Sequence, residues 1–180
     1  MKNQNTKKLA YAALFLALCL VLPMLTGQIP QIGSMLLPMH IPVLLCGLVC
    51  GWQYGAAVGF VAPLLRSVLF GMPPMYPVAI AMAFELLTYG LVIGLVYRRM
   101  AQKSLAGVYA ALLTAMVAGR LVWGMAEVVL LGLGGKAFTA QAFLAGALLN
   151  AVPGIIVQLV LIPAVMAALQ KAGAVKEYAE

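Results

Sequence analysis

LAGVYAALLTAMVAGRLVWGMAEVVLL, residues 105–131, is the stretch that decides the fold. It is long and apolar enough to cross a bilayer as one helix, because about 20 apolar residues span the hydrocarbon core. It also carries Arg120 and Glu127. A charge at membrane depth costs several kcal/mol, roughly 3 on insertion scales, so it is kept where it is paired, hydrated or used. The stretch therefore predicts a membrane helix that contributes to a polar site.

The whole chain has this apolar character. Hydrophobic residues make up 65% of the 180 residues and charged residues 8%, against about 45–50% and 25% in soluble domains. The mean hydropathy is +1.08, and no polar block or linker divides the chain, so we expect one domain over residues 1–180. The predicted fold is an all-α integral membrane protein, a single bundle of six transmembrane helices. Hydropathy places them at about residues 9–25, 38–52, 55–71, 78–97, 105–131 and 140–169.

Turn residues set the boundaries of these helices. We expect a tight turn at Gln53 and Tyr54, and a break over residues 72–77, MPPMYP. Proline has no amide donor and restricts the residue before it, so this run ends a helix. For the same reason we expect the last helix to bend near Pro153 and Pro163.

The basic residues predict the orientation. Six spans put both termini on one side, where the loops and ends collect Lys2, Lys7, Lys8, Arg98, Arg99, Lys103, Lys171 and Lys176. The other side has Lys136 alone. Cytoplasmic loops are rich in Lys and Arg, so both termini are expected in the cytoplasm. The net charge of +7 is then a consequence of topology, and we expect no nucleic-acid partner.

The strongly polar residues within the spans all fall in the outer halves of the helices: Arg66, Glu85, Arg120, Glu127 and Asn150. The inner halves hold little polar beyond Gln158 and Tyr11. A pocket that opens outward fits this placement better than a polar path across the membrane. We therefore take the five outer residues as candidate substrate-binding residues.

A structural role is the alternative for the charged residues. Arg66 with Glu85, and Arg120 with Glu127, would form two ion pairs that hold helices together. The two interpretations are compatible, because a glutamate can orient an arginine whose remaining donors bind a ligand carboxylate.

Other side chains are candidate ligand contacts, and each has an alternative. His40 is either a ligand contact or an interfacial histidine with its bonds satisfied. Three aromatic residues either stack on a ligand ring or belong to the aromatic belts at the membrane surface: Tyr76, Tyr89 and Trp123. The cysteines, Cys19, Cys46 and Cys50, are expected to be small core residues rather than a metal or redox site.

Small residues recur at a spacing of four. The series is Gly47, Gly51, Gly55 and Gly59, with further pairs at Gly90 and Gly94 and at Ala13 and Ala17. Small-x-x-x-small faces let two helices approach closely. Most such pairs serve packing within one chain.

These features together resemble the substrate-binding S components of energy-coupling-factor (ECF) vitamin transporters. The resemblance lies in the six apolar segments, the basic N-terminus, the A-x-x-x-A of Ala13 and Ala17 and the long first outer loop. Two further stretches, LPMHIPV at 37–43 with the G-x-x-x-G after it and GMPPMYP at 71–77, look like the branch that includes pantothenate, folate and pyridoxine carriers.

The resemblance implies a multi-pass protein of the bacterial cell (inner) membrane that captures a vitamin from outside and uses no cofactor. It would dock through Ala13 and Ala17 on an ECF transmembrane coupling subunit driven by two ATPase subunits. The first outer loop and the turn after the third helix would cover the ligand. Two arginines favour a ligand with a carboxylate or phosphate, and so pantothenate, although the two glutamates could instead hold ring nitrogens or hydroxyls.

Enzyme readings have little support in the sequence. It has no G-x-S-x-G, H-E-x-x-H or Walker A motif, and its only histidine has no carboxylate or cysteine at ligand spacing, so we expect no catalytic or metal site. Two other classes stay open. A stand-alone secondary transporter usually shows repeated halves, and a structural subunit would use the charges only to hold its helices together.

Overall fold

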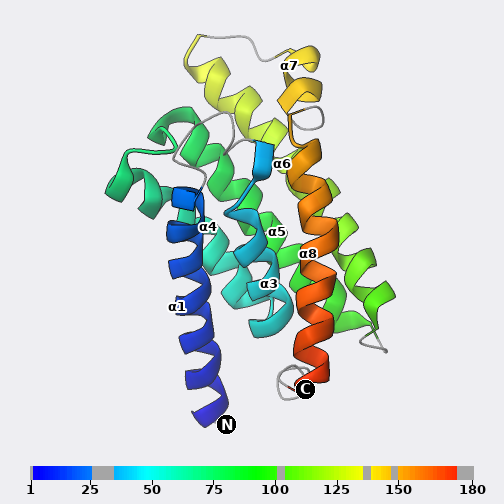
Figure 1. Ribbon diagram of the computed structural model, residues 1–180. Helices are drawn as coiled ribbons and strands as arrows, with labels where there is room; N and C mark the ends of the chain where they lie inside the picture. The colour runs from blue at the N-terminus through cyan, green and yellow to red at the C-terminus, as the bar shows by residue number, and fades with distance from the viewer. Residues whose placement is uncertain (1, 26–34, 101–103, 136–138, 147–149, 174–180) are drawn as a thin grey trace.

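The computed structural model describes residues 2–25, 35–100, 104–135, 139–146 and 150–173. These ranges contain helices and no strand (Figure 1). The elements are α1 (Lys2–Leu25), α3 (His40–Cys50), α4 (Trp52–Phe70), the π-helical turn η1 (Met75–Ala79), α5 (Ile80–Arg99), α6 (Leu105–Leu133), α7 (Ala140–Leu144) and α8 (Val152–Lys171). Five helical segments of the described chain are long and apolar enough to cross a membrane: α1, α4, η1 with α5, α6 and α8. The predicted helical membrane bundle is confirmed, with the 11-residue α3 as a shorter apolar helix inside it.

The shortest of the main helices lies at the centre of the bundle. α3 packs against α1, α4, α5 and α8, and all its residues except Ile41 are buried. A helix that is apolar on every side is stable only when it is surrounded. α5 lies next to α3 and also contacts α4 and α6. Figure 1 shows that α1 begins and α8 ends at the same end of the bundle.

Glycines allow the closest contacts between helix backbones. A Cβ atom on Gly59 would fall 2.2 Å from the carbonyl oxygen of Leu86, and one on Gly90 would fall 2.2 Å from the carbonyl of Gly55. Gly47 has the same relation to Gly90, at 2.8 Å from its carbonyl oxygen. The spacing of small residues in the sequence therefore brings α3, α4 and α5 together.

The turn between α3 and α4 differs from the prediction. It lies at Gly51, whose φ of 98° is accessible to glycine without steric cost. Gln53 and Tyr54, predicted as the turn, are in the first turn of α4. The predicted break after α4 is present: α4 ends at Phe70, its cap residue Gly71 has a φ of 68°, and the backbone is still extended at Tyr76, with φ −117° and ψ 133°.

The predicted helix over residues 140–169 is two helices. α7 ends at Leu144 and α8 starts at Val152. Pro153 lies in the first turn of α8, where the missing amide donor has no cost, so it starts a helix rather than bending one. Pro163 lies inside α8.

Some predicted features lie outside the described residues. They include most of the first outer loop, over residues 26–34, and the basic residues Lys103, Lys136 and Lys176. The three cysteines lie within the described ranges and are buried, as expected for core residues.

Candidate functional site

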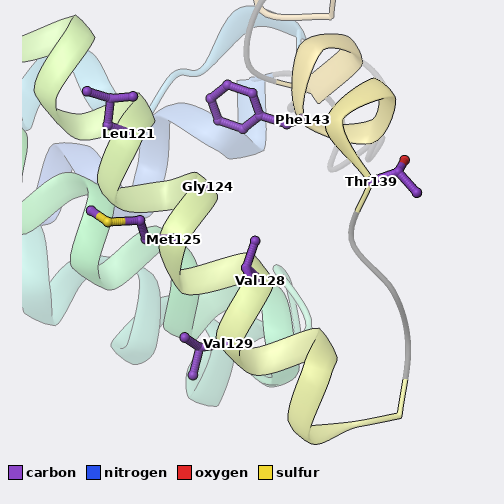
Figure 2. Close-up of a pocket in the computed structure, with 7 residues that line it drawn as sticks. All are labelled: Leu121, Gly124, Met125, Val128, Val129, Thr139 and Phe143. Carbon is purple, nitrogen blue, oxygen red and sulfur yellow. The ribbon is translucent and has the colours of Figure 1, made fainter.

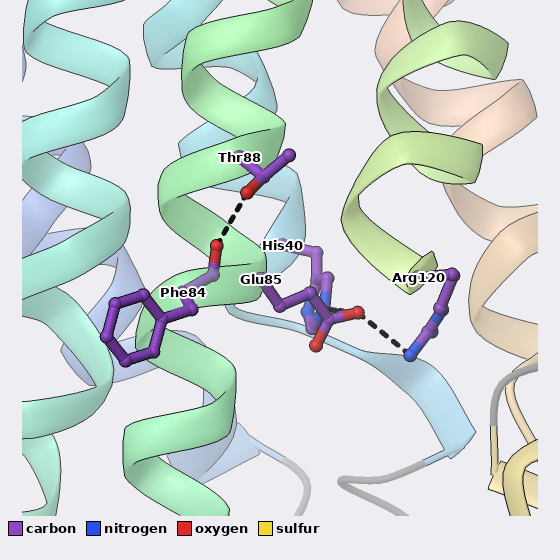
Figure 3. A network of polar contacts seen from close by, with 5 residues as sticks. All are labelled: His40, Phe84, Glu85, Thr88 and Arg120. Carbon is purple, nitrogen blue, oxygen red and sulfur yellow. Dashed lines mark hydrogen bonds and ion pairs between the residues drawn. The ribbon is translucent and has the colours of Figure 1, made fainter. Parts of the chain in front are cut away.

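A buried carboxylate joins three helices. Glu85, in the second turn of α5, is 1% exposed. Its Oε1 atom lies 2.9 Å from Nη1 of Arg120 on α6 and 3.5 Å from Nε2 of His40, the first residue of α3. Figure 3 shows the Glu85 side chain between the other two. Three predicted site residues, far apart in the sequence, therefore meet at one point.

Tyr89 belongs to the same cluster. It follows Glu85 by one turn of α5, and its ring meets that of His40 edge-on with the centroids 5.2 Å apart. Its hydroxyl is close enough to the Glu85 carboxylate for the two groups to interact. Because Tyr89 is 1% exposed, it is a core residue of the bundle and not part of an aromatic belt.

The chain enters α3 through a strained turn that places His40. Leu37 has a φ of 50°, a left-handed conformation that costs a non-glycine residue about 1–3 kcal/mol. The His40 amide bonds back to the Leu37 carbonyl at 3.0 Å. Gly154 of α8 lies against this segment, since a Cβ there would be 3.0 Å from the Leu36 carbonyl oxygen. The contact with α8 thus supports the turn that directs His40 into the bundle.

Many polar atoms of the cluster have no hydrogen-bond partner among the described residues. They are both ring nitrogens of His40, Nε and Nη2 of Arg120, and Oε1 of Glu85. A buried polar atom without a partner costs about 1–3 kcal/mol, and native proteins contain few of them. Their concentration around one carboxylate is typical of a site that receives a polar ligand.

Arg66 lies away from this cluster. It is 2% exposed, and its Nη1 donates to the carbonyl of Leu20 on α1. Its guanidinium lies 5.2 Å from the centre of the Phe70 ring. The predicted pairing of Arg66 with Glu85 is wrong, because Arg66 ties α4 to α1 while Glu85 faces α6.

Glu127 borders the cluster without the predicted partner. It lies two turns after Arg120 on α6 and is buried, but Arg120 faces Glu85 instead. Glu127 is close enough to Glu85 for the two carboxylates to repel each other. The predicted pair of Arg120 with Glu127 is therefore also wrong.

The remaining predicted site residues lie near α7 and the start of α8. Trp123 stacks on Phe143 of α7, with the ring centroids 6.1 Å apart and the planes 27° from parallel. Asn150 is exposed, and its backbone amide bonds to the Ala145 carbonyl at 2.9 Å. The structure does not bring the Asn150 side chain into the buried cluster.

A comparison with protein families gives one match. The family of the ECF transporter substrate-specific component matches residues 7–167. The chain belongs to this family. Comparison with curated proteins and with solved structures gave no match. The resemblance drawn from the sequence is confirmed at the level of the family, and this S component is a substrate-specific subunit of an importer.

The S component also has an apolar hollow between α6 and α7 (Figure 2), lined by Leu121, Gly124, Met125, Val128, Val129, Thr139 and Phe143. The side chains of Leu121, Met125, Val128 and Val129 are exposed, whereas Arg120 and Glu127 lie on another face of the same helix. In a membrane protein an apolar face of this kind meets lipid tails. The cluster around Glu85 is the better ligand site, because it offers the polar atoms that fix a ligand.

Gln158 of the S component was not predicted as a site residue from the sequence. Gln158 of α8 is 1% exposed, and its Nε2 atom has no partner among the described residues. The sequence showed it only as a polar residue of the inner half. A lone amide in an otherwise apolar helix was the signal that could have identified it.

Proposed function

We propose that this S component captures a small water-soluble vitamin or related metabolite outside the cell, with high affinity, for delivery into the cytoplasm. The observation that carries the proposal is the buried cluster of His40, Glu85, Tyr89 and Arg120, with its unpaired polar atoms, inside a bundle of this family. Glu127 at its border is a further candidate ligand contact.

The position of the cluster supports capture from outside. His40 begins α3 and Glu85 lies near the start of α5. Both helices run toward the end of the bundle at which α1 begins and α8 ends (Figure 1). The distribution of Lys and Arg puts those two ends in the cytoplasm. The cluster then lies in the outer half of the membrane.

Energy for release would come from partner subunits. Ala13 and Ala17 are exposed on α1, and small residues there let a second helix approach closely. We place the docking surface for the transmembrane coupling subunit at these two alanines, with ATP hydrolysis by two further subunits. Among vitamins, pantothenate is the candidate that Arg120 favours, because it carries a carboxylate.

A structural subunit is the second candidate function. The ion pair between Arg120 and Glu85 at 2.9 Å favours it, because such a pair would hold α5 and α6 together without any ligand.

Mass spectrometry of small molecules released from the purified protein distinguishes the two functions. The S component, expressed in a vitamin-rich medium and purified in mild detergent, is expected to release one metabolite in near-stoichiometric amount. Uptake of that metabolite by cells should require both this chain and an active ATPase module. A protein that carries no metabolite, and whose melting temperature no water-soluble vitamin raises, supports the structural subunit.

A further inference from the structure

Three of the buried polar atoms without a hydrogen-bond partner among the described residues can only donate a hydrogen bond. Arg120 contributes Nε and Nη2, and Gln158 contributes Nε2. The Glu85 Oε1 atom has no hydrogen bond but forms an ion pair with Arg120 at 2.9 Å, so its charge is compensated. The three donor atoms have no hydrogen-bond acceptor among the described residues. The group that completes the site must therefore supply acceptors.

The two free nitrogens of Arg120 lie on one edge of its planar guanidinium. Because Nη1 faces Glu85, the edge formed by Nε and Nη2 is left over. Two parallel N–H groups on such an edge match the two oxygens of a carboxylate. The Arg120 side chain is 13% exposed, and shielding from water strengthens a charge-assisted bond. Glu85 thus orients the arginine, and the free edge is a seat for an oxyanion.

Gln158 lies on the buried side of α8, together with Gly154 and Ile162. It follows Gly154 by one turn on the same helix face, and Gly154 contacts the backbone of Leu36 just before α3. Four residues advance a helix by about 6 Å. Gln158 therefore lies about 6 Å further along α8 than the point where Gly154 meets Leu36. The chain also continues from Leu36 to His40. α8 also packs against both α3 and α6, the helices of His40 and Arg120.

The geometry points to an oxyanionic ligand, best a carboxylate, held by the Nε and Nη2 edge of Arg120 and by the amide of Gln158. This inference rests on the proposed function, since it names the chemical class of the captured ligand and adds Gln158 to its site. Glu127 does not oppose it. Glu127 and Arg120 are seven residues apart on α6, which corresponds to about 10 Å. The Glu127 carboxylate oxygens can therefore accept a hydrogen bond from a hydroxyl or amine at the other end of the ligand.

Stabilisation of the protein by fractions of yeast extract tests the charge of the ligand, and the ligand need not be identified. The small-molecule filtrate is divided by anion exchange into a retained and an unretained fraction, and each is added to ligand-free protein. The retained fraction is expected to raise the melting temperature, and the unretained fraction is not. Equal or greater stabilisation by the unretained fraction overturns the oxyanion inference and leaves the proposed function standing. If neither fraction stabilises the protein, the proposed function fails and this inference with it.

Two pairs of variants test the residues with the retained fraction. Arg120→Lys keeps a positive charge opposite Glu85 but loses the two-bond edge, so the half-saturating amount should rise about tenfold to a hundredfold. Arg66→Lys is the matched control, since Arg66 contacts Leu20 and Phe70, and it should bind as the wild type does. Equal binding by all three proteins contradicts the role of Arg120.

Gln158→Met removes the unpaired donor at nearly constant volume. The ligand-free melting temperature should stay or rise, while the half-saturating amount rises about two- to tenfold. Gln158→Glu places a carboxylate opposite the oxyanion and should weaken binding further. Unchanged binding by Gln158→Met rejects the assignment of Gln158. These variants leave the Arg120 ion pair intact. They therefore test the oxyanion site even if Arg120→Lys does not fold.

Discussion

Glu85 and Glu127 carry the same group in different surroundings. The charge of Glu85 is compensated by Arg120 at 2.9 Å, and Glu85 lies 3.5 Å from a His40 nitrogen. Glu127 has no ion pair among the described residues, and the negative charge of Glu85 repels it. The same substitution should therefore affect the two positions in opposite ways.

We expect Glu85→Gln to lower the ligand-free melting temperature and Glu127→Gln to keep or raise it. The first change leaves Arg120 uncompensated at membrane depth, which costs about 3–5 kcal/mol in buried pairs. The second removes a repulsion between two carboxylates. Thermal unfolding in detergent, followed by tryptophan fluorescence, measures both. A larger loss for Glu127→Gln than for Glu85→Gln would show that the charge arrangement described here is wrong.

The sequence predicted that Glu85 and Arg120 lie at a similar level of the bundle, but it predicted other partners for both. Hydropathy located Glu85 and Arg120 in the outer halves of their helices, and the structure puts them together. Hydropathy does not predict how each helix is rotated about its own axis. That rotation decides that Arg66 faces Leu20 on α1. Packing of glycines against neighbouring backbones fixes that rotation, and a single sequence shows the glycines without showing what they face.

At the scale of the helices, close packing of α4 on α5 depends on Gly59. A Cβ there would lie 2.2 Å from the Leu86 carbonyl oxygen, whereas a Cβ on Gly132 of α6 would meet nothing within 4 Å. Gly59→Ala should therefore destabilise the protein by about 1–3 kcal/mol or more. Gly132→Ala, the matched control, should stabilise α6 by up to about 1 kcal/mol. Melting temperatures of the two variants check this, and equal values would argue against the tight α4–α5 contact.

The exposed face of α1 carries a prediction about coupling. Ala13→Leu and Ala17→Leu should abolish co-purification with the coupling subunit, because a larger side chain blocks close helix approach. Ligand binding should survive, since α1 contributes no residue to the cluster around Glu85. Pull-down and ligand titration of the same preparation measure both effects. If a folded variant loses both ligand binding and docking, the two alanines support the cluster around Glu85 instead.

The ends of the helices were the least predictable elements. The turn at Gly51 requires a left-handed backbone, but the four glycines between residues 47 and 59 all offered one. Pro153 can bend a helix or begin one, and only the structure shows that it begins α8. In both cases several positions satisfied the local rule, and tertiary contacts selected one of them.

For the molecule as a whole, the proposed capture from outside depends on the orientation that the basic residues predict. In a background with Cys19, Cys46 and Cys50 replaced by alanine, Lys136→Cys should react with a membrane-impermeant thiol reagent on intact cells. Arg98→Cys, on the side predicted to be cytoplasmic, should react only after lysis. The opposite pattern would place the cluster in the cytoplasmic half and remove the basis for capture from outside.

The central claim is that the cluster around Glu85 holds a transported metabolite, and native mass spectrometry tests it most directly. The wild-type protein, released from detergent after growth in vitamin-rich medium, should show a second peak displaced by the mass of one small molecule. The peak should persist in Arg66→Lys and be lost or strongly reduced in Arg120→Lys. Folded wild-type protein without the second peak, or a peak equally strong in Arg120→Lys, would contradict the account.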